Sequence, residues 1–320
     1  MTVIKSFGGI DVDTCYTIMG LETGFGTHNR GVFGGGYAGS AANRIDYISI
    51  NSTSNATDFG DLTLARYSVS GSSNGLNNRG VFGGGNDGSK INVIDYITIN
   101  SISNATDFGD LTLARDHLSA TSNGTNERGV FNGGIDSGAA KKNTIDYVTI
   151  SSISNAIDFG DLTNSKAYTA STSNATNERG IIAGGYSTIT LNVIGYITIN
   201  SASNATDFGD LTLARYGPSG TSNGTNERGV IGGGYISNVI DYVTISSISN
   251  ATDFGDLTVA KYYLSATSNC TDERGVFGGG HTGAVRINVI EYITINSTGN
   301  ATDFGSLTLG RSNLSATSNS

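Results

Sequence analysis

Aspartates three residues apart recur along the chain and are the side chains best suited to hold a cation. The first pair is Asp58 and Asp61. Five of the six copies of this segment have such a pair, whereas the last copy has Asp303 followed by Ser306. The segment has neither the number nor the order of oxygen ligands found in calcium loops. We interpret these aspartates as turn caps or as partners of a repeated arginine, and we expect no metal and no cofactor.

The residues needed for acid–base or nucleophilic catalysis are not grouped in the sequence. His28, His117 and His281 fall at different positions of the repeat and form no recognisable ligand set. No Ser/His/Asp motif is present, and the Asp-Phe-Gly triplets lack the other signature segments of a protein kinase. We therefore expect a protein that is not an enzyme.

A glycine-rich segment, Arg79-Gly-Val-Phe-Gly-Gly-Gly85, is the most regular feature of the chain. A glycine-rich run can cradle a phosphate, but this one lacks the Lys-Ser/Thr of a phosphate-binding loop and reads better as a buried strand. Its arginine recurs with a spacing of 46 to 51 residues (274 − 228 and 179 − 128), which is typical of solenoids, propellers and other arrays. The six copies begin at Arg30, Arg79, Arg128, Arg179, Arg228 and Arg274.

Each copy contains four segments that read as short strands, as residues 79–127 illustrate. After the glycine-rich strand and a loop come Val93–Ile99, Asn104–Thr112 and Ala114–Ser122, and then Asn123-Gly124 signals a tight turn. Apolar residues on both faces of Val93–Ile99 indicate that neighbours cover both faces. Four-stranded units of this length are typical of propeller blades. We therefore predict an all-β, six-bladed β-propeller with four antiparallel strands per blade.

The end of the chain has the residues to complete the first blade. Residues 312–318 repeat the fourth strand type but have no following copy to join. Pairing them with the blade of residues 30–65 closes the ring and removes exposed strand edges, so residues 30–320 are predicted to form the propeller. Residues 1–29 match the repeat only in part. They are either a degenerate blade or strand or an extension that anchors the domain. In the first case residues 15–22 would take the same place, or residues 1–29 and the C-terminus would make a seventh, incomplete blade.

A carboxylate lies within the predicted buried strand of five copies: Asp46, Asp95, Asp146, Asp241 and Glu291. In the remaining copy the place is taken by Gly195. A buried ionised carboxylate must be paired or hydrogen-bonded. The arginine that opens each copy is the obvious candidate, so we hypothesise a structural ion pair between each opening arginine and the carboxylate.

The order of these segments resembles the kelch repeat. The resemblance rests on a hydrophobic run into Gly-Gly, a tyrosine-containing strand, an aromatic-containing strand at Asn104–Thr112 and a shortened Leu-x-x-Arg at Leu113–Arg115, and it covers residues 30–320. The chain departs from the kelch pattern in having no tryptophan, which weakens assignment to the eukaryotic kelch group. Phenylalanines stand where kelch blades usually have tryptophan: Phe59, Phe108, Phe159, Phe208, Phe254 and Phe304.

The amino-acid sequence of the repeat is also similar to that of repeat arrays in structural proteins of marine bacteriophages. The segments with this likeness are Ile-Asp-Tyr-Ile-Thr-Ile and the following Asn-Ala-Thr-Asp-Phe-Gly-Asp-Leu-Thr. The resemblance implies a component of the virion, such as a tail fibre, an appendage or a part of the capsid surface, made in the host cytoplasm. Its partners would be other virion proteins, with residues 1–29 as one place of attachment.

Composition narrows the classes of partner. The net charge of −9 argues against a binder of nucleic acid, which needs a concentrated basic surface. No stretch reaches the roughly 18 apolar residues that cross a bilayer, and the first residues lack the apolar run of a signal peptide. Cys15 and Cys270 do not make a disulfide framework. We expect no nucleic acid and no membrane insertion, while a homo-oligomer is left open.

Two places differ between the copies: the loop after the glycines and the connection between blades. Strand directions put both on one face of the propeller, and loops on a rigid scaffold are where binding residues usually lie. The alternative, that surface loops vary without a role, stays open. Candidate binding residues in the loops are Tyr37, Asn86, Asp87, Lys90, Asp136, Lys141, Lys142, Tyr186, Tyr235, His281 and Arg286. Candidates in the connections are Tyr67, His117, Tyr168, Tyr216 and Tyr263.

These observations favour a non-enzymatic structural or adhesive module of a phage virion. It would bind a partner, a host surface protein or a glycan through the variable loops. The alternatives are a cytosolic protein-interaction scaffold of the kelch kind and an enzyme with an unrecognised site on the ring axis.

Overall fold

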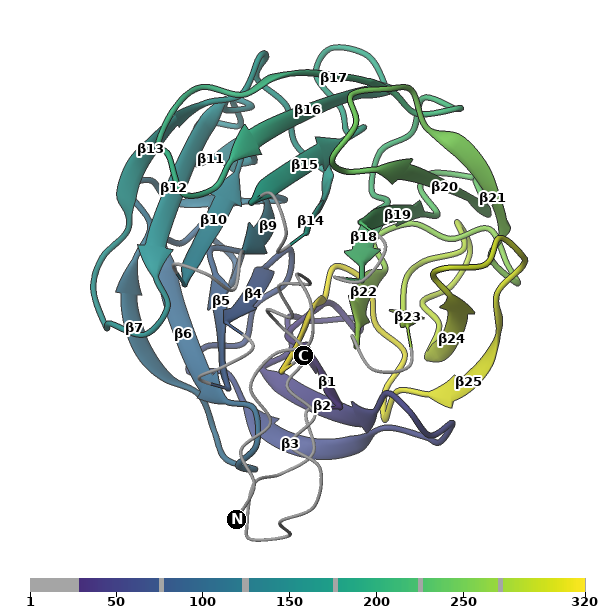
Figure 1. The fold of residues 1–320 in the computed structure, drawn as a ribbon. Helices are drawn as coiled ribbons and strands as arrows, with labels where there is room; N and C mark the ends of the chain where they lie inside the picture. The colour runs from purple at the N-terminus through teal and green to yellow at the C-terminus, as the bar shows by residue number, and fades with distance from the viewer. Residues whose placement is uncertain are drawn as a thin grey trace, which may run out of the picture.

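Six four-stranded antiparallel sheets are arranged as blades around one axis (Figure 1). The computed structural model describes residues 29–74, 78–122, 127–174, 178–223, 227–269 and 273–319. Every helix or strand element in these residues is a β-strand. The predicted all-β, six-bladed propeller is thereby confirmed. The question whether the N-terminal segment is a strand or an anchor lies in residues 1–28, outside the described residues.

The strands of each blade are given from the axis outward. Blade 1 consists of β26 (Ser315–Ser318), β1 (Arg30–Gly34), β2 (Arg44–Ser49) and β3 (Thr57–Asp61), and blade 2 of β4 (Ser70–Asn74), β5 (Arg79–Gly83), β6 (Val93–Thr98) and β7 (Thr106–Asp110). Blade 3 consists of β9 (Ser119–Ser122), β10 (Arg128–Asn132), β12 (Thr144–Thr149) and β13 (Ile157–Asp161), and blade 4 of β14 (Ala170–Ser173), β15 (Arg179–Ala183), β16 (Val193–Thr198) and β17 (Thr206–Asp210). Blade 5 consists of β18 (Ser219–Ser222), β19 (Arg228–Gly232), β20 (Val239–Thr244) and β21 (Thr252–Asp256), and blade 6 of β22 (Ser265–Ser268), β23 (Arg274–Gly278), β24 (Val289–Thr294) and β25 (Thr302–Ser306). The short strands β8 (Arg115–Asp116) and β11 (Ile135–Asp136) pair with each other.

The C-terminal strand closes the ring. β26 pairs antiparallel with β1, with Ser318 opposite Gly31 and Ser315 opposite Gly34. The last strand of the chain is therefore the innermost strand of blade 1, as predicted. Because every other blade also takes its innermost strand from the end of the preceding sequence copy, the swap leaves no blade incomplete.

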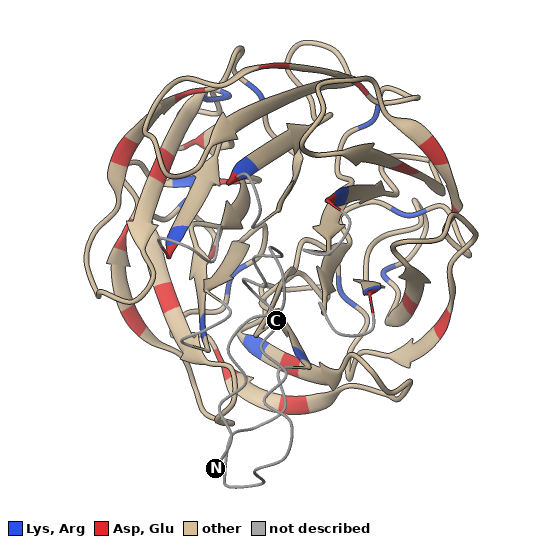
Figure 2. Ribbon diagram, in the orientation of Figure 1, with Lys and Arg blue, Asp and Glu red and all other residues tan. Residues whose placement is uncertain are grey.

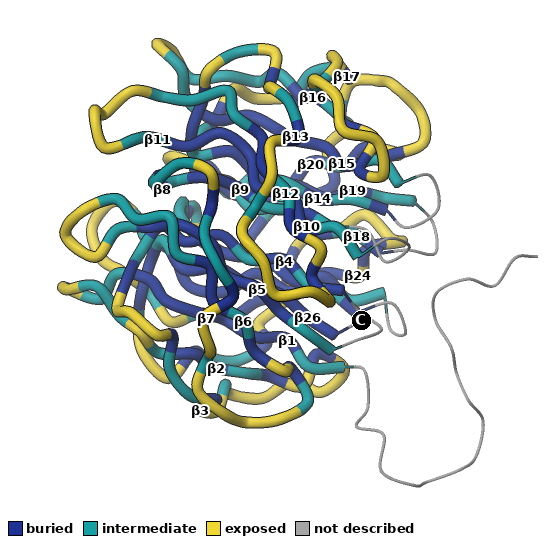
Figure 3. The backbone as a smooth tube through the Cα atoms, turned by 90° about the vertical axis from the view of Figure 1, so that its left-hand side faces the viewer, coloured by how far each residue is buried: buried dark blue, intermediate teal, exposed yellow. Residues whose placement is uncertain are grey.

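The hydrophobic core lies between blades rather than within them. One cluster joins Val32, Ile45 and Phe59 of blade 1 to Phe82 and Ile97 of blade 2, and all five side chains are buried. The same arrangement recurs at the other boundaries, which gives the dark band in Figure 3. Burial of each such side chain stabilises the fold by about 1.5–3 kcal/mol. A single blade has no partner for either face and would lose this contribution.

A glycine and an aromatic ring meet at four of the blade boundaries. A Cβ atom added to Gly83 would lie 2.7 Å from the ring of Phe131, so the ring requires glycine there. The four pairs are Gly34–Phe82, Gly83–Phe131, Gly232–Phe277 and Gly278–Phe33. At the other two boundaries the glycine is replaced by Asn132 or Ala183, and the facing residue of the next copy is Ile182 or Ile231. The larger residue thus occurs only where the ring is absent.

Buried ion pairs fix the connection that enters a blade to the third strand of that blade. Arg66, between β3 and β4, donates Nη2–H to Asp95 Oδ2 at 2.9 Å, and both side chains are fully buried. Arg66 also donates to the carbonyl oxygens of Phe82 and Val93. The pairs are Arg66–Asp95, Arg115–Asp146, Arg215–Asp241, Lys261–Glu291 and Arg311–Asp46.

The hypothesis that the opening arginines pair with these carboxylates is wrong. Arg79 lies opposite Thr98 in the β5–β6 register, whereas Asp95 lies opposite Phe82. Three residues along a strand correspond to about 10 Å. The Arg79 guanidinium instead lies over the Tyr96 ring, 4.6 Å from its centroid, and donates to the carbonyl oxygen of Ile150 in the next blade at 2.9 Å. The arginines that open the other copies have the same two contacts.

The aspartates of the Asp-Phe-Gly segments lie in the outermost strands (Figure 2). Asp58 is exposed. Neither Asp58 nor Asp61 is in an ion pair among the described residues, so no arginine partner supports that part of the interpretation. The Asp61 backbone N–H donates to Asn104 Oδ1 of the next blade at 3.0 Å. The segment therefore joins neighbouring blades through its backbone.

Candidate binding face

The loop after the glycines and the connection between blades lie side by side. Tyr67 bridges to Asn86, Ala167 to Tyr186, and β8 pairs with β11, all in antiparallel fashion. In Figure 3 these loops project to the left, near the β8 and β11 labels. The prediction that the two variable places share one face is confirmed. We call this surface the loop face.

Six connection residues form a closed ring of hydrogen bonds on the axis of the loop face. Each donates its backbone N–H to the carbonyl oxygen of its counterpart in the preceding connection, at 2.8–3.2 Å. We call this set the axial ring; its members are Ser68, His117, Tyr168, Gly217, Tyr263 and Asn313. All six have φ between 53° and 70°. This left-handed conformation costs roughly 1–3 kcal/mol for a non-glycine residue and persists where the surroundings enforce it.

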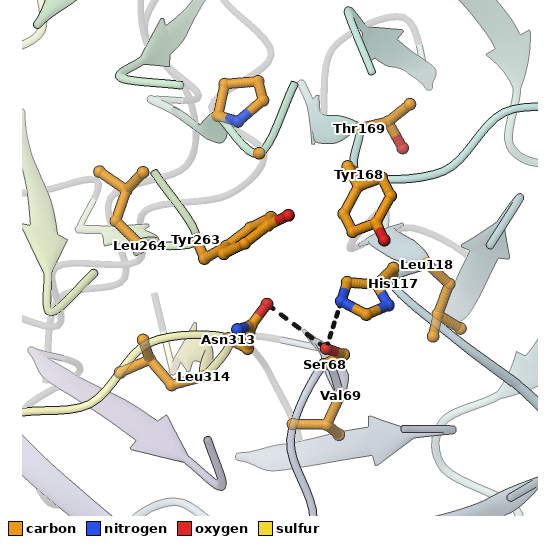
Figure 4. A pocket seen from close by; sticks show the side chains of 12 residues that line it. Ser68, Val69, His117, Leu118, Tyr168, Thr169, Tyr263, Leu264, Asn313 and Leu314 are labelled. Atoms are coloured by element: carbon orange, nitrogen blue, oxygen red, sulfur yellow. Dashed lines mark hydrogen bonds between the residues drawn. The ribbon is translucent and has the colours of Figure 1, made fainter. Parts of the chain in front are cut away.

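The residue type in the axial ring differs from one connection to the next, although the backbone repeats. Because the ring hydrogen bonds are made by backbone atoms, the side chains are free to vary. They surround a small cavity of ≈ 70 Å³ (Figure 4). Repetition of the backbone therefore presents a non-repeating set of side chains at the centre of the loop face.

The polar members of the axial ring are linked by side-chain contacts. Ser68 Oγ lies 2.8 Å from His117 Nε2 and donates weakly to Asn313 Oδ1 at 3.4 Å. His117 Nδ1 lies 3.0 Å from Asp116 Oδ1. Burial raises the pKa of Asp116, but the contact with His117 and a hydrogen bond from Asn86 outweigh burial, so the pKa is lowered overall. Asp116 therefore stays ionised beneath the ring.

The Ser68, His117 and Asp116 side chains were not identified from the sequence as a group. Their contacts resemble the order of a nucleophile, a base and an acid. However, the contact between His117 Nδ1 and Asp116 Oδ1 has hydrogen-bond length without hydrogen-bond direction. The backbone N–H groups of Ser68 and His117 are both used within the axial ring, so neither is available to stabilise an oxyanion. This geometry suits recognition of a polar group better than acyl transfer.

Aromatic side chains extend from the axial ring toward the rim of the loop face. Tyr216 is the hub: it stacks on Tyr235 with centroids 4.9 Å apart and an interplanar angle of 14°, and it contacts Tyr186 at 5.9 Å. Tyr216 also contacts Tyr168 and Tyr263 of the axial ring. We call the connected set the aromatic cluster; its members are His117, Tyr168, Tyr186, Tyr216, Tyr235, Tyr262, Tyr263 and His281.

Burial affects the phenol groups of three members of the aromatic cluster, Tyr168, Tyr216 and Tyr263. Burial raises the pKa of Tyr168 to about 12. Burial also raises the pKa of Tyr263 and, to a smaller degree, that of Tyr216. These three phenols therefore keep their protons, and each offers one O–H donor.

The remaining candidates lie around the cluster. Arg286 lies over the Tyr37 ring at 4.4 Å, and Tyr37 in turn contacts Tyr67 at 5.2 Å. Lys141 lies over the Tyr186 ring at 4.8 Å. These contacts add positive charge beside the aromatic rings.

Other predicted residues are engaged within their own loops. Lys142 Nζ lies 2.7 Å from Asp136 Oδ2. Asp87 accepts a hydrogen bond from the Ser89 backbone, and Lys90 is bridged to Asn86. The Lys142, Asp136 and Asp87 side chains shape their loops and are less available to a ligand, whereas the bridge between Lys90 and Asn86 is made by backbone atoms.

Sequence reasoning missed four residues of this face: Ser68, Asp116, Tyr262 and Asn313. Ser68, Asp116 and Tyr262 belong to the same variable dipeptides as predicted residues, and Asn313 belongs to the variable dipeptide Ser312-Asn313, from which no candidate was taken. No group of three or more His, Cys, Asp or Glu side chains suited to a metal occurs in the described residues. No helix long and apolar enough to span a membrane occurs in the described part of the chain.

A scan against protein-family models finds no match to this chain, and a search of curated proteins finds none either.

Proposed function

We propose that the chain is a non-enzymatic recognition module that binds a partner through the loop face. The observation that supports this best is the aromatic cluster, because its members lie at positions where the sequence copies differ. Tyr216, Tyr235 and Tyr186 form one contact network although they come from three different loops and connections. Side chains that serve only the stability of the scaffold repeat in every copy. Tyr47 is an example, because each of the other copies has a tyrosine at the same position.

The chemistry of the loop face suits a glycan or a protein surface. Tyrosine supplies a large contact area at modest cost in conformational entropy. A sugar ring can stack on Tyr235, which is 44% exposed, while the half-buried Asn313 offers hydrogen-bonding groups at the axis. The net charge of −9 disfavours nucleic acid.

The test is a glycan array and a host-cell binding assay with the native chain and a Tyr216→Ser/Tyr235→Ser variant. Loss of two aromatic anchors is expected to weaken binding by about 10–100-fold. Ile102→Ser is the matched control, because Ile102 is 57% exposed but lies in the turn between β6 and β7 on the opposite face. Equal binding by all three proteins would refute a role for the loop face.

The setting we propose is a bacteriophage virion, where the chain serves as a structural or adhesive component such as a tail fibre. Support comes from the similarity of its repeat to those of marine phage structural proteins. Mass spectrometry of purified particles tests this part separately. Absence of the chain from particles would leave the kelch-type scaffold, with a cellular protein on the same face, as the better proposal.

A second candidate, an enzyme with an axial site, is favoured by the 2.8 Å contact between Ser68 Oγ and His117 Nε2. An activated serine reacts with fluorophosphonate probes. We expect no labelling of Ser68, since its side chain is buried and no oxyanion site adjoins it. Labelling that disappears in Ser68→Ala would establish the enzyme instead.

A further inference from the structure

Blade 4 retains the buried cation of the repeated ion pair but lacks the carboxylate. Lys166 occupies the position of Arg66 and makes the same backbone bonds: its N–H donates to Lys142 O, and its carbonyl accepts from Gly134 N–H. Its side chain is buried, with a residue exposure of 1%. Within the described parts of the chain, Lys166 Nζ has neither a hydrogen-bond partner nor an ion-pair partner.

The place of the missing carboxylate is open. Gly195 stands where Asp95 stands in blade 2, as the strand registers show, because Gly195 is opposite Ile182 and Asp95 is opposite Phe82. A Cβ atom added to Gly195 would meet only the Thr206 carbonyl oxygen, at an ordinary contact distance of 3.5 Å. The group removed from blade 4 is a CH₂–COO⁻ unit, which has the size and charge of acetate.

The hydrogen-bond donors for a carboxylate are also in place. In blade 2 the carboxylate of Asp95 accepts from Thr63 Oγ1 at 2.6 Å and from the Thr63 backbone N–H at 3.1 Å. Thr163 occupies the same position before blade 4 and makes no such bond among the described residues. Thr163 is exposed, as its counterpart Thr63 is.

Lysine at this position needs a carboxylate that reaches further than aspartate does. In blade 6 the lysine is Lys261, and its partner is the longer Glu291, with Nζ and Oε1 2.5 Å apart. An unattached carboxylate meets this need because it can move toward the ammonium group. Burial lowers the pKa of Lys166 to about 8, which leaves the amine largely protonated at neutral pH.

We propose that blade 4 has a site for a small monocarboxylate ion of formate or acetate size, held by Lys166 Nζ and by the Thr163 backbone N–H and hydroxyl. The ion replaces the side chain that Gly195 lacks. The site is independent of the loop face and of what that face binds.

Thermal unfolding in sodium acetate, compared with sodium chloride at equal ionic strength, tests the proposal. A ligand that binds only the folded state raises Tm, and about a tenfold excess over its Kd corresponds to a rise of about 2 °C for a chain of this size. Gly195→Asp is the matched control, because its side chain fills the place of the ion and should abolish the specific effect of acetate. Lys166→Met should abolish it as well.

The structure of crystals grown with and without acetate gives a second readout that does not depend on the variants. We expect density for a carboxylate in contact with Lys166 Nζ. An equal rise in Tm for the native chain and Gly195→Asp would reveal a general salt effect and overturn the proposal. So would an equal rise in chloride and acetate, or no rise at all.

Discussion

Blades 4 and 6 bury a lysine at the same place with different surroundings. Lys261 is paired with Glu291, and both side chains are fully buried, whereas Lys166 faces Gly195. Burial lowers the pKa of both lysines, but only for Lys261 does a carboxylate counteract it. Blade 4 thus keeps the buried cation without the carboxylate that accompanies it in the other five blades.

The difference follows from the chemistry of the cation. Arginine stays protonated in proteins, so a buried arginine without an acid would be an uncompensated charge. Lysine can release its proton when burial is too costly. In blade 4 the glycine at position 195 is combined with a lysine rather than an arginine. This combination limits the cost of burying a charge without a partner. Positions across a blade boundary therefore change in pairs, as the Gly83–Phe131 and Ala183–Ile231 boundaries also do.

The largest effects should come from replacing the two lysines by methionine. Lys261→Met leaves Glu291 buried without its partner and should destabilise the protein by about 3–5 kcal/mol. Lys166→Met removes a buried charge that has no partner and should stabilise it by about 3 kcal/mol at pH 7. Denaturant unfolding in a buffer free of carboxylates measures both. A change of the same sign for the two variants would contradict the comparison.

The pH dependence of stability should separate the native chain from Lys166→Met. The pKa of Lys166 is lowered by burial to about 8 in the folded state, and in the unfolded state it is near the ordinary lysine value of 10.5. Between these values the unfolded state holds more protons, so the stability of the native chain rises with pH. Lys166→Met should therefore exceed the native chain in free energy of unfolding by about 3 kcal/mol below pH 8, and this difference should disappear as the pH approaches 10.5. The measured quantity is the difference in free energy of unfolding between the two proteins at each pH. In this difference the titration of groups common to both proteins cancels. A gap that does not change with pH would show that Lys166 is not the titrating group.

A smaller effect is expected at the glycine–phenylalanine boundary between blades 2 and 3. In Gly83→Ala the new methyl group would be forced against the Phe131 ring, at a cost of about 1–3 kcal/mol. Adding Phe131→Ile reproduces the Ala183–Ile231 combination and should recover part of this cost. A double-mutant cycle measured by denaturant unfolding gives the coupling, expected to be about 0.5–3 kcal/mol. Additive effects would show that the two positions do not act as a pair.

The architecture was predictable because it depends on features that repeat. Val93–Ile99 has apolar residues on both faces, so each copy must pack between two others, and residues 312–318 have no other partner than the first blade. The buried state of Asp95 followed from the same pattern. Its partner did not, because Arg79 of the same copy competes with Arg66 of the preceding copy, and only the strand register and the blade arrangement separate them.

The loop face was predictable in location but not in structure. Comparison of the copies showed where side chains vary, and this located Tyr216, Tyr235 and His117 on one face. The axial ring was not predictable, because its hydrogen bonds join residues about one repeat apart and its left-handed conformation is adopted by Tyr168 and Ser68 alike. No local sequence signal distinguishes such residues from ordinary loop residues.

The smallest effect on stability should follow from changes on the loop face, where positions do not pair across a blade boundary. Tyr235 is 44% exposed and stacks on Tyr216. Tyr235→Ser removes one exposed aromatic contact and should cost about 0.5–1 kcal/mol. Denaturant unfolding measures this cost, and the binding assay described above should show a much larger loss. If the variant instead loses stability as Lys261→Met does, Tyr235 belongs to the scaffold, and the distinction between paired boundary positions and a freely varying binding face would not hold.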